Sequence, residues 1–390
     1  MGIIVQKYGG SSLADPEKIK NVASHVVDTY RNGNSVVVVV SAMGKTTDEL
    51  LRMAKQISPN PPKRELDMLL SVGERISIAL LAMAIQELGV DAISFTGSQV
   101  GIITDTHHTQ ARILEVKGHR LQEALKEGKI AIVAGFQGVS TNKEITTLGR
   151  GGSDATAVAI SAALNADECQ IMKDVDGVFV ANPKIVSSVK LTPELSYDEM
   201  LEMSELGAEV INHYAVEIAR HYKVKISVGN TFSGSIGTII TDKSFETAKI
   251  SGIVGNDKVF AVKIQKGNSS QIWDLQNAIE ENRWKTYYSY LTDSTFWAVF
   301  DESCQTDICD FLQGKHWDHP PIVHDDVTLI SVIGSGLNYN SPLVKDILNK
   351  IEIYDKEILS FQATIQKISI ILKGKDKSRK VVNEIYEIVQ

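Results

Sequence analysis

The segment Thr147-Leu-Gly-Arg-Gly-Gly-Ser-Asp154 combines flexible glycines, a guanidinium, hydroxyls and a carboxylate. Glycines allow the backbone to approach an anion closely, and the free N–H groups at the start of a helix attract one. Arg150 can hold a carboxylate through two parallel hydrogen bonds, which a lysine cannot do. Asp154 could simply cap the helix predicted at 155–163, but capping does not account for Arg150. The segment therefore predicts an anion site that includes a carboxylate clamp.

Three further loops follow predicted strands and carry glycine, hydroxyl or charged groups. Each has a simpler interpretation as a turn, and Ser41–Asp48 lacks the glycine spacing of a Walker A loop. Ligands bind at the carboxyl ends of the strands in open α/β sheets, so the recurrence of such loops favours a nucleotide or phosphate site. The loops are Lys7-Tyr-Gly-Gly-Ser-Ser12, Ser41-Ala-Met-Gly-Lys-Thr-Thr-Asp48 and Lys173-Asp-Val-Asp-Gly-Val-Phe-Val-Ala-Asn-Pro-Lys184.

The elements that would position these loops alternate between strands and helices. Short β-branched runs predict buried strands, and apolar residues at helical spacing predict helices between them. This alternation indicates an α/β layer structure with a mainly parallel sheet. The predicted strands cover residues 1–7, 36–40, 130–134, 169–172 and 225–228, and the predicted helices cover 66–88, 110–125, 155–163 and 197–206.

The composition changes beyond a boundary placed at residues 241–250. All four tryptophans lie after residue 270, and glycine-rich turns become sparse. Two passages then repeat a strand followed by a helix, at 259–264 with 271–281 and at 327–332 with 343–350. The second passage continues with a strand at 367–372 and a helix at 378–388. We predict two small α+β units in this part of the chain.

The overall composition excludes several classes of protein. The net charge is −8, which argues against a general binder of nucleic acid or of membrane surfaces. The amino terminus lacks the features of a signal peptide, and no uninterrupted apolar run reaches membrane-spanning length. The three cysteines form no metal-ligand pattern and fit a reducing compartment. We expect a cytoplasmic protein.

Taken together and in order, the motifs of residues 3–243 resemble those of the aspartate kinases of the amino-acid kinase superfamily. The resemblance extends through the loops described above and several further segments. These segments are Ser71-Val-Gly-Glu-Arg75, Phe95-Thr-Gly-Ser-Gln-Val-Gly-Ile102, Thr104-Asp105, Ala134-Gly-Phe-Gln-Gly138 and Leu195-Ser-Tyr-Asp-Glu-Met-Leu201. The resemblance implies the three-layer α/β amino-acid kinase fold over residues 1–243.

The same resemblance implies a reaction and its participants. MgATP would phosphorylate the side-chain carboxylate of L-aspartate to 4-phospho-L-aspartate, the first step towards lysine, threonine and methionine. No dedicated protein cage for the metal is expected. The catalytic residues would be Lys7 and Asp154. The residues that bind aspartate would be Ser41, Glu74, Arg150 and Ser153, and ATP would lie along Lys7, Gly9, Gly10, Lys173, Asp174, Phe179 and Lys184.

Several positions depart from the family pattern on the nucleotide side. Threonine is common where Lys173 stands, arginine where Lys184 stands, and lysine where Glu209 stands. The expected His-Pro pair is replaced by Asn212-His213-Tyr214. Lys173 or Lys184 would have to supply the positive charge that Glu209 does not.

The tail resembles the tandem ACT modules of aspartate kinases, which sense amino acids and form homodimers. We place the modules at residues 250–325 and 326–390, with an effector loop at Ser335, Leu337 and Asn338. The Asp-x-Pro-Gly turn typical of the first module is replaced by Lys266-Gly-Asn-Ser-Ser270. The Ser-Glu pair typical of the last strand is replaced near Thr364-Ile365. We therefore expect weak or altered feedback by lysine or threonine.

Two other functions are compatible with parts of the sequence. A kinase acting on glutamate, acetylglutamate or a nucleotide would share the loops, although Ser71-Val-Gly-Glu-Arg75 and the tail favour aspartate. A non-catalytic amino-acid sensor would explain the substitutions at Lys173 and Glu209. Such a sensor would have no chemical need to keep Lys7 and Asp154 together with the substrate clamp.

Overall fold

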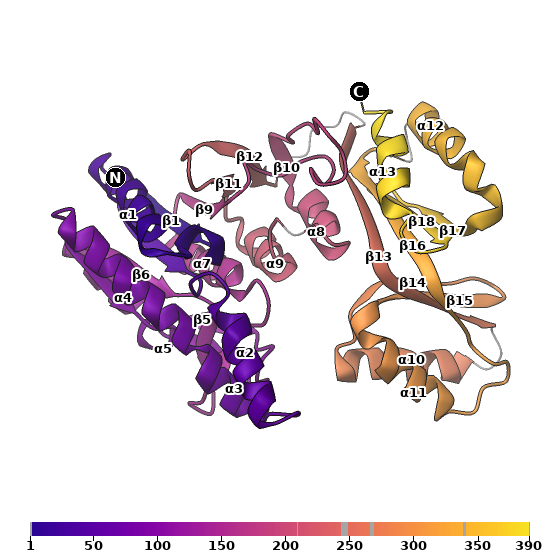
Figure 1. The fold of residues 1–390 in the computed structure, drawn as a ribbon, viewed down its shortest axis with the longest axis horizontal. Helices are drawn as coiled ribbons and strands as arrows, with labels where there is room; N and C mark the ends of the chain where they lie inside the picture. Colours follow the sequence, from indigo (N-terminus) through magenta and orange to yellow (C-terminus); the bar gives the residue numbers. More distant parts are fainter. Residues whose placement is uncertain (1, 209, 243–248, 266–268, 338–340, 390) are drawn as a thin grey trace. The chain divides into compact units, whose positions relative to one another are not determined.

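The computed structural model describes residues 2–208, 210–242, 249–265, 269–337 and 341–389. The chain divides into two compact units (Figure 1). The first comprises Met1–Val178, Leu191–Ser204 and Glu209–Ser244, and the second comprises Phe179–Lys190, Glu205–Ala208 and Phe245–Gln390. Two short segments that precede residue 243 in the sequence thus pack with the second unit.

The first unit is built on an eight-stranded sheet with the order β10-β12-β11-β9-β1-β2-β6-β3. The five pairings from β11 through β9, β1, β2 and β6 to β3 are all parallel, which confirms the mainly parallel α/β sheet. The strands are β1 (Ile3–Tyr8), β2 (Ser35–Val40), β3 (Ala92–Phe95), β6 (Ile130–Ala134), β9 (Glu168–Lys173), β10 (Glu194–Ser196), β11 (Ile226–Asn230) and β12 (Ile236–Thr241).

Helices cover both faces of this sheet. On one face α1 and α4 pack on alternate residues of β2 and β6, including Val36, Val38 and Ile132. On the other face α7 packs against β1, β2 and β9 (Figure 1). The helices of the unit are α1 (Pro16–Arg31), α2 (Thr46–Ile57), α3 (Lys63–Leu70), α4 (Val72–Glu87), α5 (Gly97–Val100), α6 (His119–Lys126), α7 (Gly152–Leu164), α8 (Tyr197–Glu205) and α9 (His213–Tyr222), with the 3-10 turn η1 (Gly10–Leu13).

A second, four-stranded sheet corrects one sequence-based prediction. Residues 110–125, predicted as one helix, form a strand, β5 (Ile113–Val116), and then α6. The short strand is stabilised by antiparallel pairing with β4 (Ile102–Thr104), a tertiary contact that helical spacing does not reveal. The sheet order is β5-β4-β7-β8, with β7 (Gln137–Ser140) and β8 (Ile145–Thr147).

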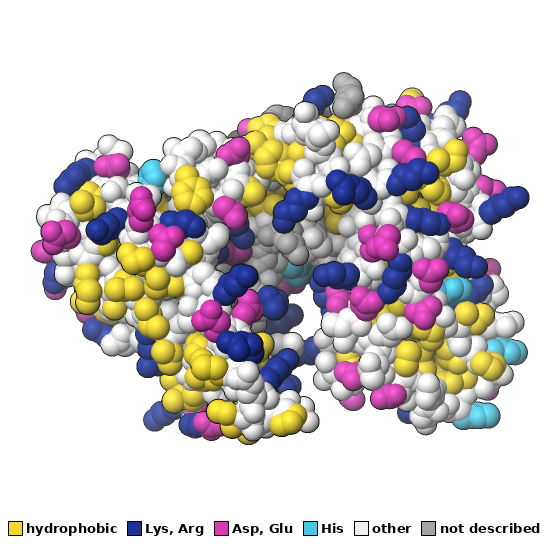
Figure 2. Space-filling model, viewed as in Figure 1, with side chains coloured by type: hydrophobic (Ala, Val, Ile, Leu, Met, Phe, Trp, Pro, Cys, Tyr) yellow, Lys and Arg dark blue, Asp and Glu magenta, His cyan; other side chains and the backbone are white. Residues whose placement is uncertain are grey.

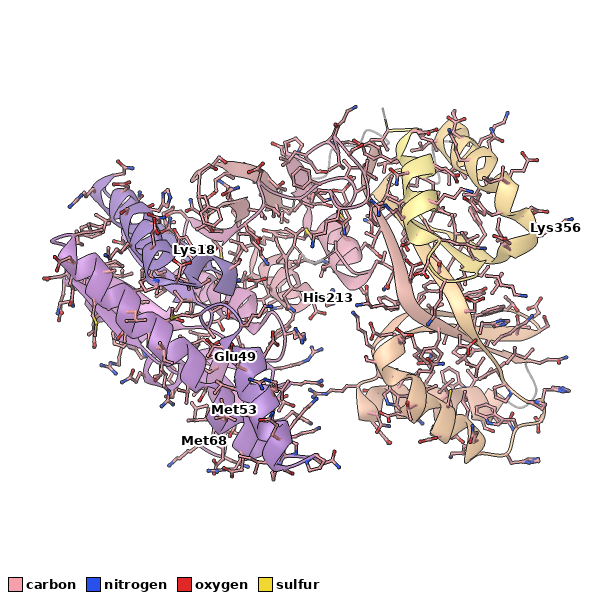
Figure 3. The ribbon with its side chains drawn as sticks, viewed as in Figure 1. Lys18, Glu49, Met53, Met68, His213 and Lys356 are labelled. Carbon is pink, nitrogen blue, oxygen red and sulfur yellow. The ribbon has the colours of Figure 1, made fainter. Side chains whose placement is uncertain are left out.

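The predicted helix 66–88 is two helices, because Ser71 ends α3 and precedes α4. Residues Lys63–Glu87 are the one stretch of the described chain with the length and composition of a membrane-spanning helix, and half of its most apolar window is buried. The buried side of α4 belongs to the core described above. The outer side exposes Val72, Ile76, Leu80 and Met83. Figure 2 shows apolar side chains gathered on the face where α4 lies in Figure 1, and Figure 3 marks the exposed Met53 and Met68 on α2 and α3.

The second unit is built on a six-stranded sheet with the order β14-β15-β13-β16-β18-β17. All its pairings are antiparallel. The strands are β13 (Lys249–Gln265), β14 (Thr286–Leu291), β15 (Thr295–Asp301), β16 (Ile322–Ser335), β17 (Ile358–Ala363) and β18 (Lys367–Lys373). The helices are α10 (Ser269–Asn282), α11 (Gln305–Gln313), α12 (Ser341–Ile351) and α13 (Ser378–Tyr386), with 3-10 turns η2 (Glu302–Cys304) and η3 (Glu352–Glu357).

This unit contains two hydrophobic clusters. One gathers Phe260 and Phe300 with residues of α10 and α11. The other gathers residues of α12 and α13, and it also includes Ile250 and Ile253 from the start of β13. The first half of β13 therefore shares a core with the last part of the chain. The division into ACT-like modules at 250–325 and 326–390 stays a prediction.

Candidate active site

The predicted site residues of the first unit meet at one edge of the eight-stranded sheet. Lys7 is the penultimate residue of β1, Ser41 follows β2, Gly135 follows β6, and Lys173 ends β9. Because these four strands are parallel neighbours, their carboxyl ends lie together. The β-branched runs of the sequence thus place four chemically active loops side by side.

A cluster of three charged groups, two of them buried and one partly exposed, lies at this edge. Lys7 Nζ is 2.6 Å from Asp154 Oδ1, and Lys173 Nζ is 3.5 Å from Asp154 Oδ2. Lys7 and Asp154 are only 5% and 2% exposed. Two ammonium groups against one carboxylate leave the cluster with one positive charge. Burial of charge is costly unless it is compensated, so an uncompensated positive charge favours binding of an anion here.

The pKa values in this cluster follow from burial and from the neighbouring charges. Burial opposes ionisation of Asp154, but Lys173 and Lys7 outweigh it and hold the pKa of Asp154 at about 2. Burial and repulsion by Lys173 lower the pKa of Lys7, while Asp154 acts in the opposite direction. Asp154 is thus a carboxylate throughout the physiological range, and it keeps Lys7 oriented.

The loops after β1 and β2 are pressed together beside Lys7. The Gly44 N–H donates to the Gly10 carbonyl, and a side chain at Gly10 would meet the Ala42 carbonyl at 2.8 Å. Gly9 is more open, since the nearest atom to a side chain there would be Lys7 Nζ at 3.7 Å. The backbone of these glycines carries no side chain and lies next to a lysine ammonium group, so a phosphate can approach it closely.

The amino terminus of α7 is held at the same edge by contacts that only glycine permits. A side chain at Gly135 would lie 2.8 Å from Ser153, so α7 packs directly on the loop after β6. Gly151 has a φ of 74°, and a side chain there would lie 2.5 Å from the Asn212 amide. These close approaches account for the glycine that follows Arg150 and for the glycine after β6.

Asn212 is a site residue that the sequence analysis noted only as a departure from the family pattern. Its backbone N–H donates to Asp154 Oδ2 at 3.3 Å, and its side-chain amide donates to the Arg150 carbonyl at 2.9 Å. It also caps α9 by accepting from the Ala215 N–H. An Asn immediately before a helical pattern signals such a cap, but not the two contacts to the glycine-rich loop.

Glu74, on α4, reaches the loop after β2. Its Oε1 accepts from the Ala42 N–H at 3.2 Å. Within the part of the chain that the structure describes, its Oε2 is buried without a hydrogen-bond partner. Burial raises the pKa of Glu74 to about 7. A buried carboxylate oxygen without a donor is chemically suited to receive an ammonium group.

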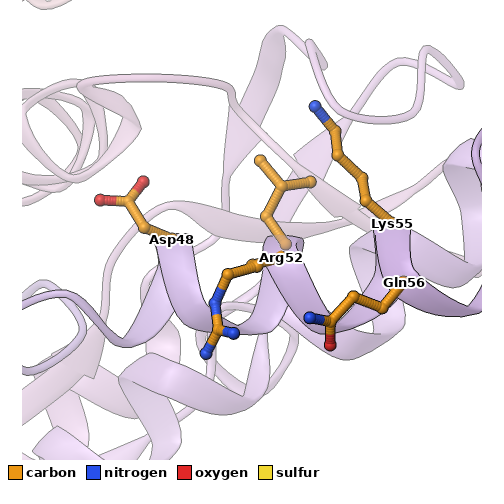
Figure 4. Close-up of a pocket in the computed structure, with 5 residues that line it drawn as sticks. Asp48, Arg52, Lys55 and Gln56 are labelled. Atoms are coloured by element: carbon orange, nitrogen blue, oxygen red, sulfur yellow. The ribbon is translucent and has the colours of Figure 1, made fainter.

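Arg150 lies exposed rather than enclosed. Its guanidinium side chain is 96% exposed and lies 4.0 Å from Asp48 at the start of α2. An open pocket of about 330 Å³ lies on that helix, lined by Asp48, Leu51, Arg52, Lys55 and Gln56 (Figure 4). None of the predicted site residues lines this pocket. The clamp predicted for Arg150 therefore depends on a ligand drawing the side chain inward.

The residues predicted along ATP divide between the two units. Lys173 and the exposed Asp174 belong to the first unit, whereas Phe179 and Lys184 belong to the segment that packs with the second. The role of these four residues in binding ATP stays a prediction. Glu209 lies outside the described residues. No cluster of three or more His, Cys, Asp or Glu side chains suited to a metal occurs among the residues with described positions.

The predicted effector loop follows β16 in the second unit. Ser335 ends the strand, and Leu337 is fully buried with its N–H donating to the Ile365 carbonyl. Asn338 lies outside the described residues. The role of these residues in binding an effector stays a prediction.

Comparison with known proteins agrees with this geometry. A family model described as "Amino acid kinase family" matches residues 2–230. Aspartokinase of Corynebacterium glutamicum is 41% identical over 396 residues, which cover 96% of this chain and 93% of that relative. Aspartokinase of Mycolicibacterium smegmatis is 55% identical over 258 residues, but the match covers 65% of this chain and 61% of the relative's length.

The chain belongs to the amino acid kinase family, among the aspartokinases. The structure of E. coli aspartokinase III in complex with aspartate and ADP superposes with a TM-score of 0.85 over 99% of both chains, at 20% identity. At that identity the likeness concerns the fold alone. It confirms the amino-acid kinase fold of the first unit followed by further α/β structure.

Proposed function

We propose that this aspartokinase-family chain transfers the γ-phosphoryl group of ATP to the side-chain carboxylate of L-aspartate. A carboxylate oxygen forms the new bond to phosphorus, the bond to the β-phosphate oxygen breaks, and ADP leaves. The observation that carries the proposal is the cluster of the buried Lys7 and Asp154 with the partly exposed Lys173 at the carboxyl edge of the sheet. The aspartokinase of C. glutamicum, 41% identical over nearly the whole chain, supports aspartate as the acceptor.

The roles of the residues follow from the charge of the reactants. The acceptor carboxylate is already a competent nucleophile, so the site needs to align it and to neutralise the phosphoryl group rather than to remove a proton. Lys7 neutralises the transferring group, and Asp154 orients Lys7. Gly9, Gly10 and Ser41 line the path of the phosphates, and Ser41 also binds the aspartate. The free oxygen of Glu74 receives the ammonium group of aspartate.

The remaining substrate contacts come from the loop that precedes α7 and from the nucleotide side. Arg150 binds the α-carboxylate, and Ser153 lies beside it. Asp174, Phe179 and Lys184 lie along the nucleotide. Mg²⁺, held chiefly by phosphate oxygens and water, would supply further charge neutralisation.

The second unit regulates this reaction and forms the homodimer. Its ACT-like modules take an amino-acid effector near Ser335, Leu337 and Asn338, with feedback weakened by the substituted loops described above. An aspartokinase III of E. coli has been solved with lysine and aspartate together. The chain acts in the cytoplasm at the first step from aspartate towards lysine, threonine and methionine.

A substrate panel with coupled detection of ADP tests the proposal. Purified protein with MgATP is given aspartate, glutamate, acetylglutamate or a nucleoside monophosphate, and the acyl phosphate is trapped with hydroxylamine. We expect ADP and hydroxamate with aspartate only. Turnover of glutamate instead would assign a different acceptor. Binding of aspartate by calorimetry without ADP release would identify a non-catalytic sensor.

A further inference from the structure

Asp67, on α3, is a fully buried carboxylate that the proposed reaction does not use. It is joined to two loops by strong hydrogen bonds. Thr147 Oγ1 donates to it at 2.6 Å, and His108 Nδ1 lies 2.6 Å from its other oxygen. The backbone N–H of Thr109 lies 3.1 Å from both oxygens. The carboxylate thus collects three donors from two segments that are distant from it in sequence.

One of these donors belongs to a strained residue. Thr109 has a φ of 70°, in the left-handed region that a β-branched residue avoids. Such a conformation persists only where the surroundings hold it in place. The paired contacts of its N–H with Asp67 supply that constraint.

The strained residue packs directly against the glycine-rich loop. A side chain at Gly149, whose φ is 77°, would lie 3.2 Å from the Thr109 carbonyl. Two residues further along, the Ala111 N–H donates to the Thr147 carbonyl at 2.9 Å. Asp67 therefore holds the loop Thr147–Asp154 in two ways. It binds Thr147, the first residue of the loop, and it fixes Thr109, against which Gly149 of the loop packs.

We infer that Asp67 is a positioning residue that sets the conformation of the loop Thr147–Asp154, and so the affinity for the carboxylate-bearing acceptor. The inference rests on the proposed function, in which Arg150 of this loop binds the α-carboxylate. Gly149 and Gly151 both have positive φ, and glycine positions lose most conformational freedom when they are ordered. An anchor at the start of the loop reduces the conformational entropy of the free loop, so less entropy is lost when the substrate binds.

The expected consequence is selective for the acceptor. Lys7 lies in β1, which pairs with β2 and β9, and Asp154 already lies within α7, so the described contacts of Asp67 reach neither residue. Loosening the loop should therefore raise the KM for aspartate while the KM for ATP changes little. A small displacement of a positioning group can cost about 100-fold in rate or affinity.

The test compares Asp67→Asn, Thr147→Val and a control, Glu199→Gln, in the full chain. Glu199 is also a buried carboxylate of the first unit, but it accepts from the N–H and hydroxyl of Ser196 at the start of α8. We expect the KM for aspartate to rise roughly 10- to 100-fold in Asp67→Asn and less in Thr147→Val. In the double variant the two increases should be less than multiplicative, because both substitutions break one interaction.

Hydrogen exchange followed by mass spectrometry gives a readout independent of activity. Asp67→Asn should speed exchange in peptides covering residues 105–112 and 147–152, whereas Glu199→Gln should not. Unchanged exchange together with an unchanged KM for aspartate in both loop variants would overturn the inference. Equal rises in the KM for aspartate and for ATP would do the same. If the wild type does not phosphorylate aspartate, the proposed function fails, while the exchange experiment still decides whether Asp67 anchors the loop.

Discussion

The two units of the chain bury different kinds of polar group. Among the described residues, the buried charged side chains lie in the first unit and are Lys7, Asp67, Glu74, Asp154 and Glu199. The buried polar side chains described in the second unit are hydroxyls, namely Ser251, Thr328, Ser331, Ser360, Ser369 and Ser378. Burying a charged group costs far more desolvation free energy than burying a hydroxyl. The buried polar groups of the first unit are therefore more destabilising than those of the second unless they are compensated.

The difference indicates that the first unit carries the reactive groups, whereas the second is held together mainly by apolar packing. In the first unit, three of these five side chains, Lys7, Glu74 and Asp154, lie at the carboxyl edge of a parallel sheet, where a phosphoryl group and an amino acid would bind. In the second unit, aromatic and aliphatic contacts such as the stacked Phe260–Phe300 pair dominate both clusters. A substitution should therefore affect mainly catalysis in the first unit and mainly stability in the second.

The largest expected effect is that of Lys7→Ala. Removing the ammonium group leaves Asp154 buried beside Lys173 alone and takes away the charge next to the phosphoryl path. We expect kcat to fall by about 1,000-fold or more, as for other electrostatic groups that act on a transition state. Circular dichroism would show whether the fold is retained. Lys225→Ala is the control, because this lysine pairs with Glu168 at the opposite end of the sheet.

A fall in turnover of less than tenfold in Lys7→Ala would contradict its catalytic role. A comparable fall in turnover in Lys225→Ala would mean that turnover is sensitive to the loss of any lysine in the first unit. The carboxyl edge of the sheet would then not differ from the opposite edge.

In the second unit, Phe260→Ala should act on stability. Phe260 is fully buried, and its ring centroid lies 5.4 Å from that of Phe300. The substitution should lower the free energy of unfolding by about 3–5 kcal/mol. All four tryptophans lie in this unit, so their fluorescence in a urea titration reports its unfolding. Lys258→Ala, an exposed residue of the same strand, is the control. An unchanged midpoint for Phe260→Ala would contradict the assignment of this core.

Glu74→Gln should weaken binding of aspartate about 100-fold, since it removes the charge opposite the substrate ammonium group. The same residue predicts the pH dependence. Burial raises the pKa of Glu74 to about 7, so the carboxylate that pairs with an ammonium group is lost as the pH falls below about 7. The KM for aspartate should then rise by up to about tenfold per pH unit.

The variant and the pH profile check each other. In Glu74→Gln, the KM for aspartate should be high and nearly constant between pH 6 and pH 8. A wild-type KM that is flat over this range, or a variant that keeps the wild-type slope, would show that another group binds the ammonium.

The smallest expected effect concerns the effector. Lysine or threonine at millimolar concentration should change aspartate turnover by less than about fivefold, below the usual range of allosteric coupling. Tryptophan fluorescence would detect binding in the second unit even where turnover does not change. Strong inhibition by lysine at low concentration would show that the substituted loops keep the family's regulation.

Sequence patterns predicted the frame of the first unit well because they are local. The β-branched run Val36–Val40 forms β2 and is buried on both faces, as expected for a central parallel strand. Patterns failed where a tertiary contact decided the conformation. Ile113–Val116 pairs with β4 instead of continuing a helix.

The sequence alone determined the family, the order of the loops and the identity of the residues at each strand end. The tertiary structure decided which of them meet. It joins Lys7 to Asp154 and links Asp67 to Thr147, and among the residues it describes it leaves one buried oxygen of Glu74 without a hydrogen-bond partner. Local patterns record only neighbours along the chain, whereas the first pairing depends on the packing of α7 against β1 and the second on the packing of α3 against β8.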